Sequence, residues 1–150
     1  KMNTTLANMS GISNGKVIDT DKEYAVAEEY RKKLKTKCPT VEQNVGNLSG
    51  GNQQKVLLAK WMFAEPDILI LDEPTRGIDV GAKYEIYCII NDLVAAGKSV
   101  IMISSELPEV LGMSDRIYIM NEGRFVGEVS GEEATSELIM SRIVKSGKGE

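Results

Sequence analysis

The stretch ILILDEPTRGID, Ile68–Asp79, decides the fold of this 150-residue chain. Its first four residues form a continuous apolar run that ends at Asp72, which predicts a strand buried on both faces. The run SVIMIS, Ser99–Ser104, predicts a second strand of the same kind. The segment between them, Val80–Ala96, predicts a helix that a glycine closes. Strand, helix and strand therefore form a right-handed parallel crossover, and the fold class is α/β.

The segments on either side of this unit predict further helices and a hairpin. Helices are expected over Asp21–Lys37, Asn52–Ala64 and Glu132–Lys145, with a short helical turn at Pro108–Leu111. A glycine turn should join Arg116–Met120 to Arg124–Val129 as antiparallel strands. The carboxyl-terminal end is thus expected to be a hairpin followed by a helix.

Composition excludes several classes of protein. Hydrophobic residues are 42% and charged residues 27%, which are ordinary values for a soluble domain. No apolar run approaches the roughly 20 residues of a membrane-spanning helix, so the chain by itself is expected to be soluble. A net charge of -4 argues against nucleic acid as a partner. The two cysteines, Cys38 and Cys88, are interpreted as reduced thiols, and the polar start lacks a signal-peptide core and looks like part of something longer.

Two adjacent acids follow the first predicted strand. Asp72 and Glu73 stand at its carboxyl end, where α/β sheets place ligands. Two buried acids need a compensating charge, which Mg²⁺ would provide. Asp72 is then expected to hold the metal, while Glu73 orients a water for in-line attack on a γ-phosphate. Taken alone, the pair is explained equally well by two solvated acids that end a strand.

A second motif, LSGGNQQK, Leu48–Lys55, precedes this strand. Its two glycines let backbone N–H groups approach a phosphate, the serine adds a hydroxyl, and the following helix directs its positive end to the same place. LSGG alone is also compatible with a Gly-Gly loop before an ordinary helix. Lys55 and Lys60 are interpreted as surface or interdomain contacts, and Trp61 as packed against the core.

The two motifs, in this order and at this separation, make the chain similar to an ATP-binding-cassette (ABC) ATPase. ILILDE resembles the Walker B strand of that family, and LSGGN resembles its LSGGQ signature, with Asn52 where glutamine is usual. EPTRGIDVGAK and SSELPEVLGMSDRI resemble the second nucleotide domain of bacterial monosaccharide importers of the ribose, galactose and xylose type. The resemblance runs from about Val41 to Val129.

The resemblance implies a partial P-loop NTPase fold that lacks the phosphate-loop half, because the sequence contains no GxxxxGK[ST] stretch. A helical signature part is expected over residues 1–65 and the Walker B part over residues 66–150. In this family each ATP lies between two cassettes, and one of them offers its signature across the interface. The residues that the resemblance implies in nucleotide contacts are Leu48, Ser49, Gly50, Gly51, Asn52, Gln53 and Asp79. They would cap an ATP held by the first cassette of the same transporter.

Ser105 stands where most ABC ATPases have a switch histidine, and the chain has no histidine. A seryl hydroxyl cannot carry a charge or shuttle a proton as imidazole can. The site with Asp72, Glu73 and Ser105 is therefore expected to be degenerate and to hold nucleotide more than it hydrolyses it. For Asp79, a bridging role between the two ATP sites and a helix N-cap are equally compatible with the sequence.

The complete protein is expected to use ATP and Mg²⁺ at the cytoplasmic face of a bacterial plasma membrane. Its partners would be membrane permease subunits and, indirectly, a periplasmic or lipoprotein sugar-binding protein. The chain alone is expected to bind ATP weakly, to be inactive and to self-associate through unpaired strands. One alternative is the carboxyl-terminal half of a DNA-repair or chromosome-organising ATPase, disfavoured because no long heptad-patterned segment precedes the signature. The other is a non-catalytic regulatory module.

Overall fold

The computed structural model describes residues 1–146, which belong to two compact units. Unit 1 extends from Lys1 to Ile103, and unit 2 begins at Ser104. This boundary separates two parts of the chain that each pack mainly against themselves. The division of the sequence at residues 65 and 66 concerns function, and it remains a proposal.

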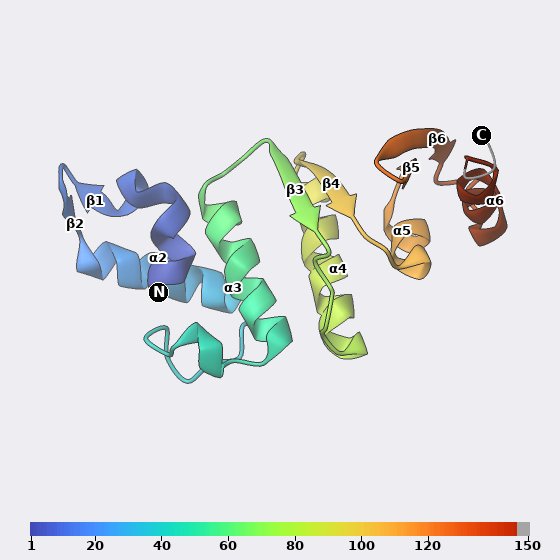
Figure 1. Cartoon of the computed structure of the whole chain (residues 1–150). Helices are drawn as coiled ribbons and strands as arrows, with labels where there is room; N and C mark the ends of the chain where they lie inside the picture. The colour runs from blue at the N-terminus through green and yellow to red at the C-terminus, as the bar shows by residue number, and fades with distance from the viewer. Residues whose placement is uncertain (147–150) are drawn as a thin grey trace. The chain divides into compact units, whose positions relative to one another are not determined.

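Unit 1 begins with helices and a small hairpin (Figure 1). In chain order its elements are α1 Met2–Thr5, the 3-10 segment η1 Leu6–Ile12, β1 Ser13–Asn14, β2 Val17–Ile18, α2 Thr20–Lys33, η2 Val45–Asn47, α3 Gly50–Phe63, β3 Ile68–Asp72, α4 Val80–Ala95 and β4 Ser99–Ile103. Helix α2 starts where expected because the Asp19 carboxylate accepts hydrogen bonds from the backbone N–H groups of Asp21 and Lys22. It ends before Lys37 because Lys35 has a φ of 51°, which no helix residue adopts.

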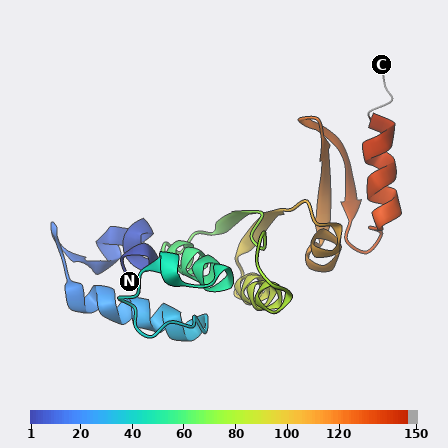
Figure 2. The same ribbon diagram turned by 60° about the horizontal axis from the view of Figure 1, so that its bottom comes forward.

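The parallel crossover is confirmed. Strands β3 and β4 pair in parallel from Ile68 opposite Ser99 to Asp72 opposite Ile103, and α4 connects them. Figure 2 shows α4 along one side of the two strands. The buried residues of this layer are Leu69, Leu71, Ile86, Ile89 and Ile90.

The expectation that these strands are buried on both faces is wrong. Along β3 the side chains alternate between buried and exposed, and Ile68 and Ile70 are 59% and 64% exposed. On β4, Ile101 and Ile103 are 52% and 50% exposed. A parallel sheet is dry on both faces only when elements cover both. The described part of unit 1 covers only one face of the β3–β4 pair. The other face exposes four isoleucines and is called the isoleucine face: Ile68, Ile70, Ile101 and Ile103.

Unit 2 is a helix, a hairpin and a second helix. Its elements are α5 Leu107–Met113, β5 Arg116–Asn121, β6 Arg124–Ser130 and α6 Ser136–Ser146. The hairpin is confirmed, and its turn residues Glu122 and Gly123 both have positive φ, as a tight two-residue turn requires. Helix α6 starts four residues later than expected because the Thr135 hydroxyl accepts the N–H of Leu138 and caps it. The core consists of Ile117, Ile119, Val129 and Ile139.

Strand pairing within the described residues is limited to β1 with β2, β3 with β4, and β5 with β6. None of the helices in residues 1–146 is long and apolar enough to span a membrane.

Candidate functional site

The signature loop, Leu48–Asn52, leads directly into α3. Ser49 occupies the N-cap position in an extended conformation, yet within the described chain its side chain caps no helix N–H. The Ser49 hydroxyl oxygen instead accepts a 2.8 Å hydrogen bond from the Asn52 side-chain nitrogen. The Asn52 side-chain oxygen, Oδ1, accepts a hydrogen bond from the backbone N–H of Lys37 at 2.7 Å. Asn52 thus ties the loop to the segment after α2.

Gln53 also supports the loop from within. Its side-chain nitrogen donates to the Leu48 carbonyl at 2.8 Å, and its backbone N–H donates to the Ser49 carbonyl at 2.9 Å. Because the Gln53 side chain holds its own loop, it acts here as a structural support, a role that the sequence did not suggest.

The two signature glycines lie against the chain that follows Walker B. A Cβ atom on Gly51 would lie 2.5 Å from the Cβ of Ala82 on α4, and one on Gly50 would lie 3.2 Å from Ile78. Sequence reasoning gave these glycines one purpose, the close approach of a phosphate. The structure adds a second, since only glycine at position 51 lets α3 approach α4 this closely.

The two acids differ in exposure. Asp72, at the end of β3, is exposed, and Glu73 is partly buried with a φ of 47°. The backbone N–H of Glu73 donates to the Ile103 carbonyl at 2.8 Å and extends the pairing with β4. The expectation of two buried acids is therefore wrong for Asp72, because the strand presents it on the isoleucine face. Its charge remains in water and does not by itself require a cation.

A magnesium site has limited support from the described residues. They contain no cluster of three or more Asp, Glu, His or Cys side chains placed to hold a metal. Mg²⁺ usually binds through one or two carboxylates together with waters and phosphate oxygens, so Asp72 and Glu73 suit it when a phosphate is also present. The residues fit Mg-ATP and do not form a metal site of their own.

Asp79 caps α4, as one of the two readings predicted. Its Oδ1 atom accepts the backbone N–H of Ala82 at 3.0 Å, and its side chain is exposed. The bridging role stays a prediction. Because Ala82 also contacts the signature loop, the cap and the loop meet at the same turn of α4.

Ser105 belongs to unit 2 and is exposed. The preceding residue, Ser104, donates its hydroxyl to the Glu109 carboxylate and accepts the backbone N–H of Glu106 at 3.0 Å. Glu109 is 3% exposed on α5. The turn that carries Ser105 is therefore anchored on α5 by its neighbour.

A family model described as "ABC transporter" matches residues 2–76, half of the chain, and includes both the signature loop and the Asp72-Glu73 pair. This chain belongs to the ABC transporter family. The resemblance seen in the motifs is thereby confirmed.

Curated relatives in this family are named for sugar transport. The chain is 62% identical over 97% of its length to the L-arabinose transport ATP-binding protein of Geobacillus stearothermophilus. It is 58% identical over 93% to a xylose import ATP-binding protein of Geobacillus kaustophilus, and 56% identical over 95% to a ribose import ATP-binding protein of Clostridium perfringens. In each case the chain spans 28% of the length of the relative.

Solved ABC cassettes share the fold. A nucleotide-free ATP-binding cassette superposes with a TM-score of 0.78 at 24% identity and covers 99% of this chain and 62% of its own. A cassette in its ADP conformation gives a TM-score of 0.69 at 27% identity, with 86% of this chain and 50% of that chain covered. The assignment to the ABC-type α/β fold is confirmed.

Two residues of the helix after the signature loop lie differently from what the sequence suggested. Lys55, interpreted as a surface or interdomain contact, is not on the surface, since it is 2% exposed and its ammonium contacts the Glu85 carboxylate at 2.9 Å. Trp61, read as a core residue, is 43% exposed, and the Lys60 ammonium lies 4.7 Å from its ring. The missed signal for Lys55 is its spacing, since it follows Gly51 by four residues and so shares the buried face of α3.

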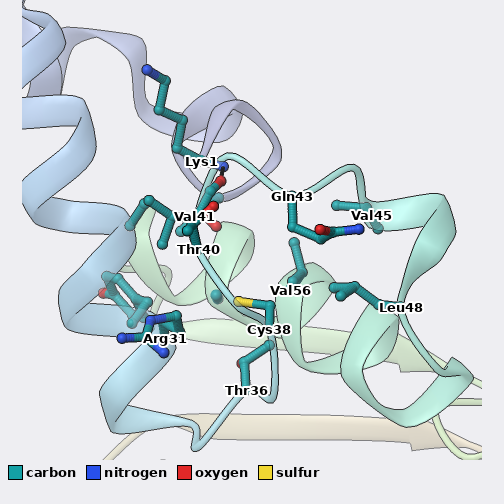
Figure 3. Close-up of a pocket in the computed structure, with 14 residues that line it drawn as sticks. Lys1, Arg31, Thr36, Cys38, Thr40, Val41, Gln43, Val45, Leu48 and Val56 are labelled. Atoms are coloured by element: carbon teal, nitrogen blue, oxygen red, sulfur yellow. Dashed lines mark hydrogen bonds between the residues drawn. The ribbon is translucent and has the colours of Figure 1, made fainter.

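A pocket lies beside the ABC signature loop (Figure 3). Residues around it include Arg31, Cys38, Gln43, Leu48 and Val56. Its cavity volume is about 30 Å³, enough for one water and far too small for a nucleotide. Leu48 lines this pocket, so its side chain contributes to the packing of unit 1.

Substituting Gly51 by alanine is expected to lower the thermal unfolding midpoint. The added methyl group meets Ala82 at 2.5 Å, so α3 and α4 must separate, at a typical cost of about 1–3 kcal/mol for overpacking. Gly112→Ala is the matched control, because no atom lies within 4 Å of a Cβ there and alanine favours the interior of α5. Equal midpoints for Gly51→Ala and the unsubstituted chain would contradict the close packing.

Proposed function

We propose that this chain forms part of the ATP-hydrolysing subunit of an ABC importer for a monosaccharide. The supporting observation is its identity of 56–62%, over more than nine tenths of its length, to ATP-binding proteins named for arabinose, xylose and ribose transport. Three different sugars at similar identity indicate that this chain does not select the sugar. Selection then belongs to the permease and the sugar-binding protein.

In this proposal the signature loop caps an ATP that the first cassette of the same transporter holds. The first N–H groups of α3 have no partner inside the helix, and Ser49 does not cap them within the described chain. Because the Ser49 oxygen accepts from Asn52, its own O–H remains able to donate to a phosphate oxygen. These donors and the helix dipole all favour an anion at this end of α3.

Asp72 and Glu73 serve the second site of the same interface. Mg-ATP, when bound there, would bring a Mg²⁺ ion whose positive charge offsets the negative charges of the two carboxylates and of the triphosphate. Asp72, which is exposed at the strand end, would bind the metal directly or through water, and Glu73 would orient a water. Ser105 cannot take or give a proton as the usual histidine does, so this second site retains nucleotide and contributes little turnover.

The partners follow from this arrangement. A second cassette is required for each ATP, and a solved relative at 24% identity is itself described as dimeric. Permease subunits would bind the cassettes at the cytoplasmic face of the membrane, and a sugar-binding protein would act through them. The functional division at residues 65 and 66 then separates the part that offers the signature from the part that carries Walker B and the switch.

Uptake by the complete protein tests this function. The polypeptide that contains this chain, reconstituted with its permease and binding protein in liposomes, is expected to hydrolyse ATP faster when a pentose or hexose is supplied. A panel of arabinose, xylose, ribose and galactose identifies the sugar, and a disaccharide is the control. ATP hydrolysis that responds to none of the monosaccharides but to DNA would favour the DNA-repair alternative.

A further inference from the structure

The largest fully buried side chain in the described part of the chain is a lysine. Lys55 is 2% exposed at the middle of α3, and a charge at such a depth requires partners. Its ammonium has two, the Glu85 carboxylate of α4 at 2.9 Å and the Lys35 carbonyl at 3.2 Å. Lys55 thereby joins three segments, namely the end of α2, the signature helix α3, and α4.

The contact with Lys55 changes the pKa of Glu85. The hydrogen bond from Lys55 holds the pKa of Glu85 below its usual value, and the positive charge of Lys37 acts in the same direction. Burial of the group and the charge of Asp79 oppose the shift. Glu85 is therefore ionised at neutral pH, and the contact is an ion pair.

The ion pair belongs to a continuous seam between α3 and α4. One turn before Lys55, Gly51 touches Ala82, and one residue before that Gly50 approaches Ile78. On α4, Glu85 follows Ala82 by three residues, so both lie on the same face. The seam thus runs from the ion pair to the start of both helices. On α3 it reaches the signature loop, and on α4 it reaches the Asp79 cap.

We propose that Lys55 is a positioning residue that fixes the signature loop relative to the Asp79 loop. Beyond the ion pair the seam consists of the glycine contacts with Ala82 and Ile78, which are non-directional and allow sliding. The Lys55 contacts are directional, and they set the register of α3 along α4. In the complete protein the two loops would then meet a partner cassette as one body. This consequence rests on the proposed function, whereas the geometry itself does not.

Nuclear magnetic resonance without nucleotide tests the geometry, with every variant made in a 150-residue chain that carries Ile70→Glu, so that association through the isoleucine face does not add exchange of its own. The readouts are the nuclear Overhauser effect between the Gly51 α-protons and the Ala82 methyl group, and relaxation dispersion at the amides of both residues. Lys55→Met keeps the length of the side chain and removes its charge, so it can preserve stability while releasing the register. We expect the Overhauser effect to weaken or vanish and microsecond-to-millisecond exchange to appear at both amides.

The comparison variants separate positioning from stability. Glu85→Gln should also weaken the Overhauser effect and cause exchange at both amides, but less than Lys55→Met. If Lys55→Met does not fold, Glu85→Gln alone tests whether the ion pair positions the loop. Lys55→Arg should restore the Overhauser effect, because a guanidinium also pairs with Glu85. Lys60→Met, on the same helix but beside Trp61, should change neither readout. Unchanged readouts in Glu85→Gln and in folded Lys55→Met, or equal changes in Lys60→Met, would overturn the proposal without bearing on the sugar-import function.

Discussion

Replacing Ser49 by arginine in the complete transporter is expected to reduce ATP hydrolysis by roughly 100-fold or more, the scale of losing a donor to the reacting group. Ser49 is exposed at the start of α3, so under the proposed function a longer side chain there would extend toward the partner cassette. The substitution also removes the oxygen that accepts from Asn52. Glu73→Gln should cost far less than the roughly 100-fold typical of a lost general base, because in the proposed arrangement the second site contributes little turnover. Hydrolysis by the purified, reconstituted transporter measures both.

The control for this prediction is Ser10→Arg, which adds the same cation at another exposed serine of unit 1. It should leave hydrolysis unchanged. Ser49→Ala, which removes the hydroxyl without adding bulk, should fall between the two. A loss of turnover in Glu73→Gln as complete as in Ser49→Arg would show that the site with Glu73 and Ser105 is competent.

The second large effect concerns the isoleucine face. The isolated 150-residue chain is expected to self-associate at micromolar concentration, because four isoleucines are at least half exposed there and the described residues cover only the opposite face. Strands β3 and β4 also pair only with each other in the described structure. Ile70→Glu should raise the dissociation constant about 10-fold or more, since burying an isoleucine is worth about 1.5–3 kcal/mol.

Light scattering from low to high micromolar concentration measures this association. Val80→Glu is the matched control, because Val80 is 83% exposed but belongs to α4 and not to the face. It should associate like the unsubstituted chain. A strictly monomeric chain at all concentrations, with the β3 and β4 amides protected from hydrogen exchange, would contradict self-association. In the complete protein we expect the same face to receive the phosphate-loop half of the cassette.

Local rules made much of the fold predictable from the sequence. Helix α4 was expected over Val80–Ala96 and occupies Val80–Ala95, because an aspartate cap and a closing glycine act within a few residues. The β5–β6 hairpin was predictable for the same reason, since its Glu122-Gly123 turn determines its own geometry. Helix α2 ended early where Lys35 adopts a positive φ, a conformation that the sequence does not announce.

The sequence by itself determined the family and led to the proposed site, because LSGG before a helix and two acids after an apolar run are patterns of adjacent residues. Only the tertiary structure decided what those residues contact. Three of these contacts depend on which elements pack together. Gly51 meets Ala82, the Gln53 side chain bonds back to Leu48, and Asp72 lies in solvent. Lys55 shows the reason most directly. A lysine is usually expected at the surface because burying its charge is costly, and here the tertiary contacts with Glu85 and the Lys35 carbonyl offset that cost.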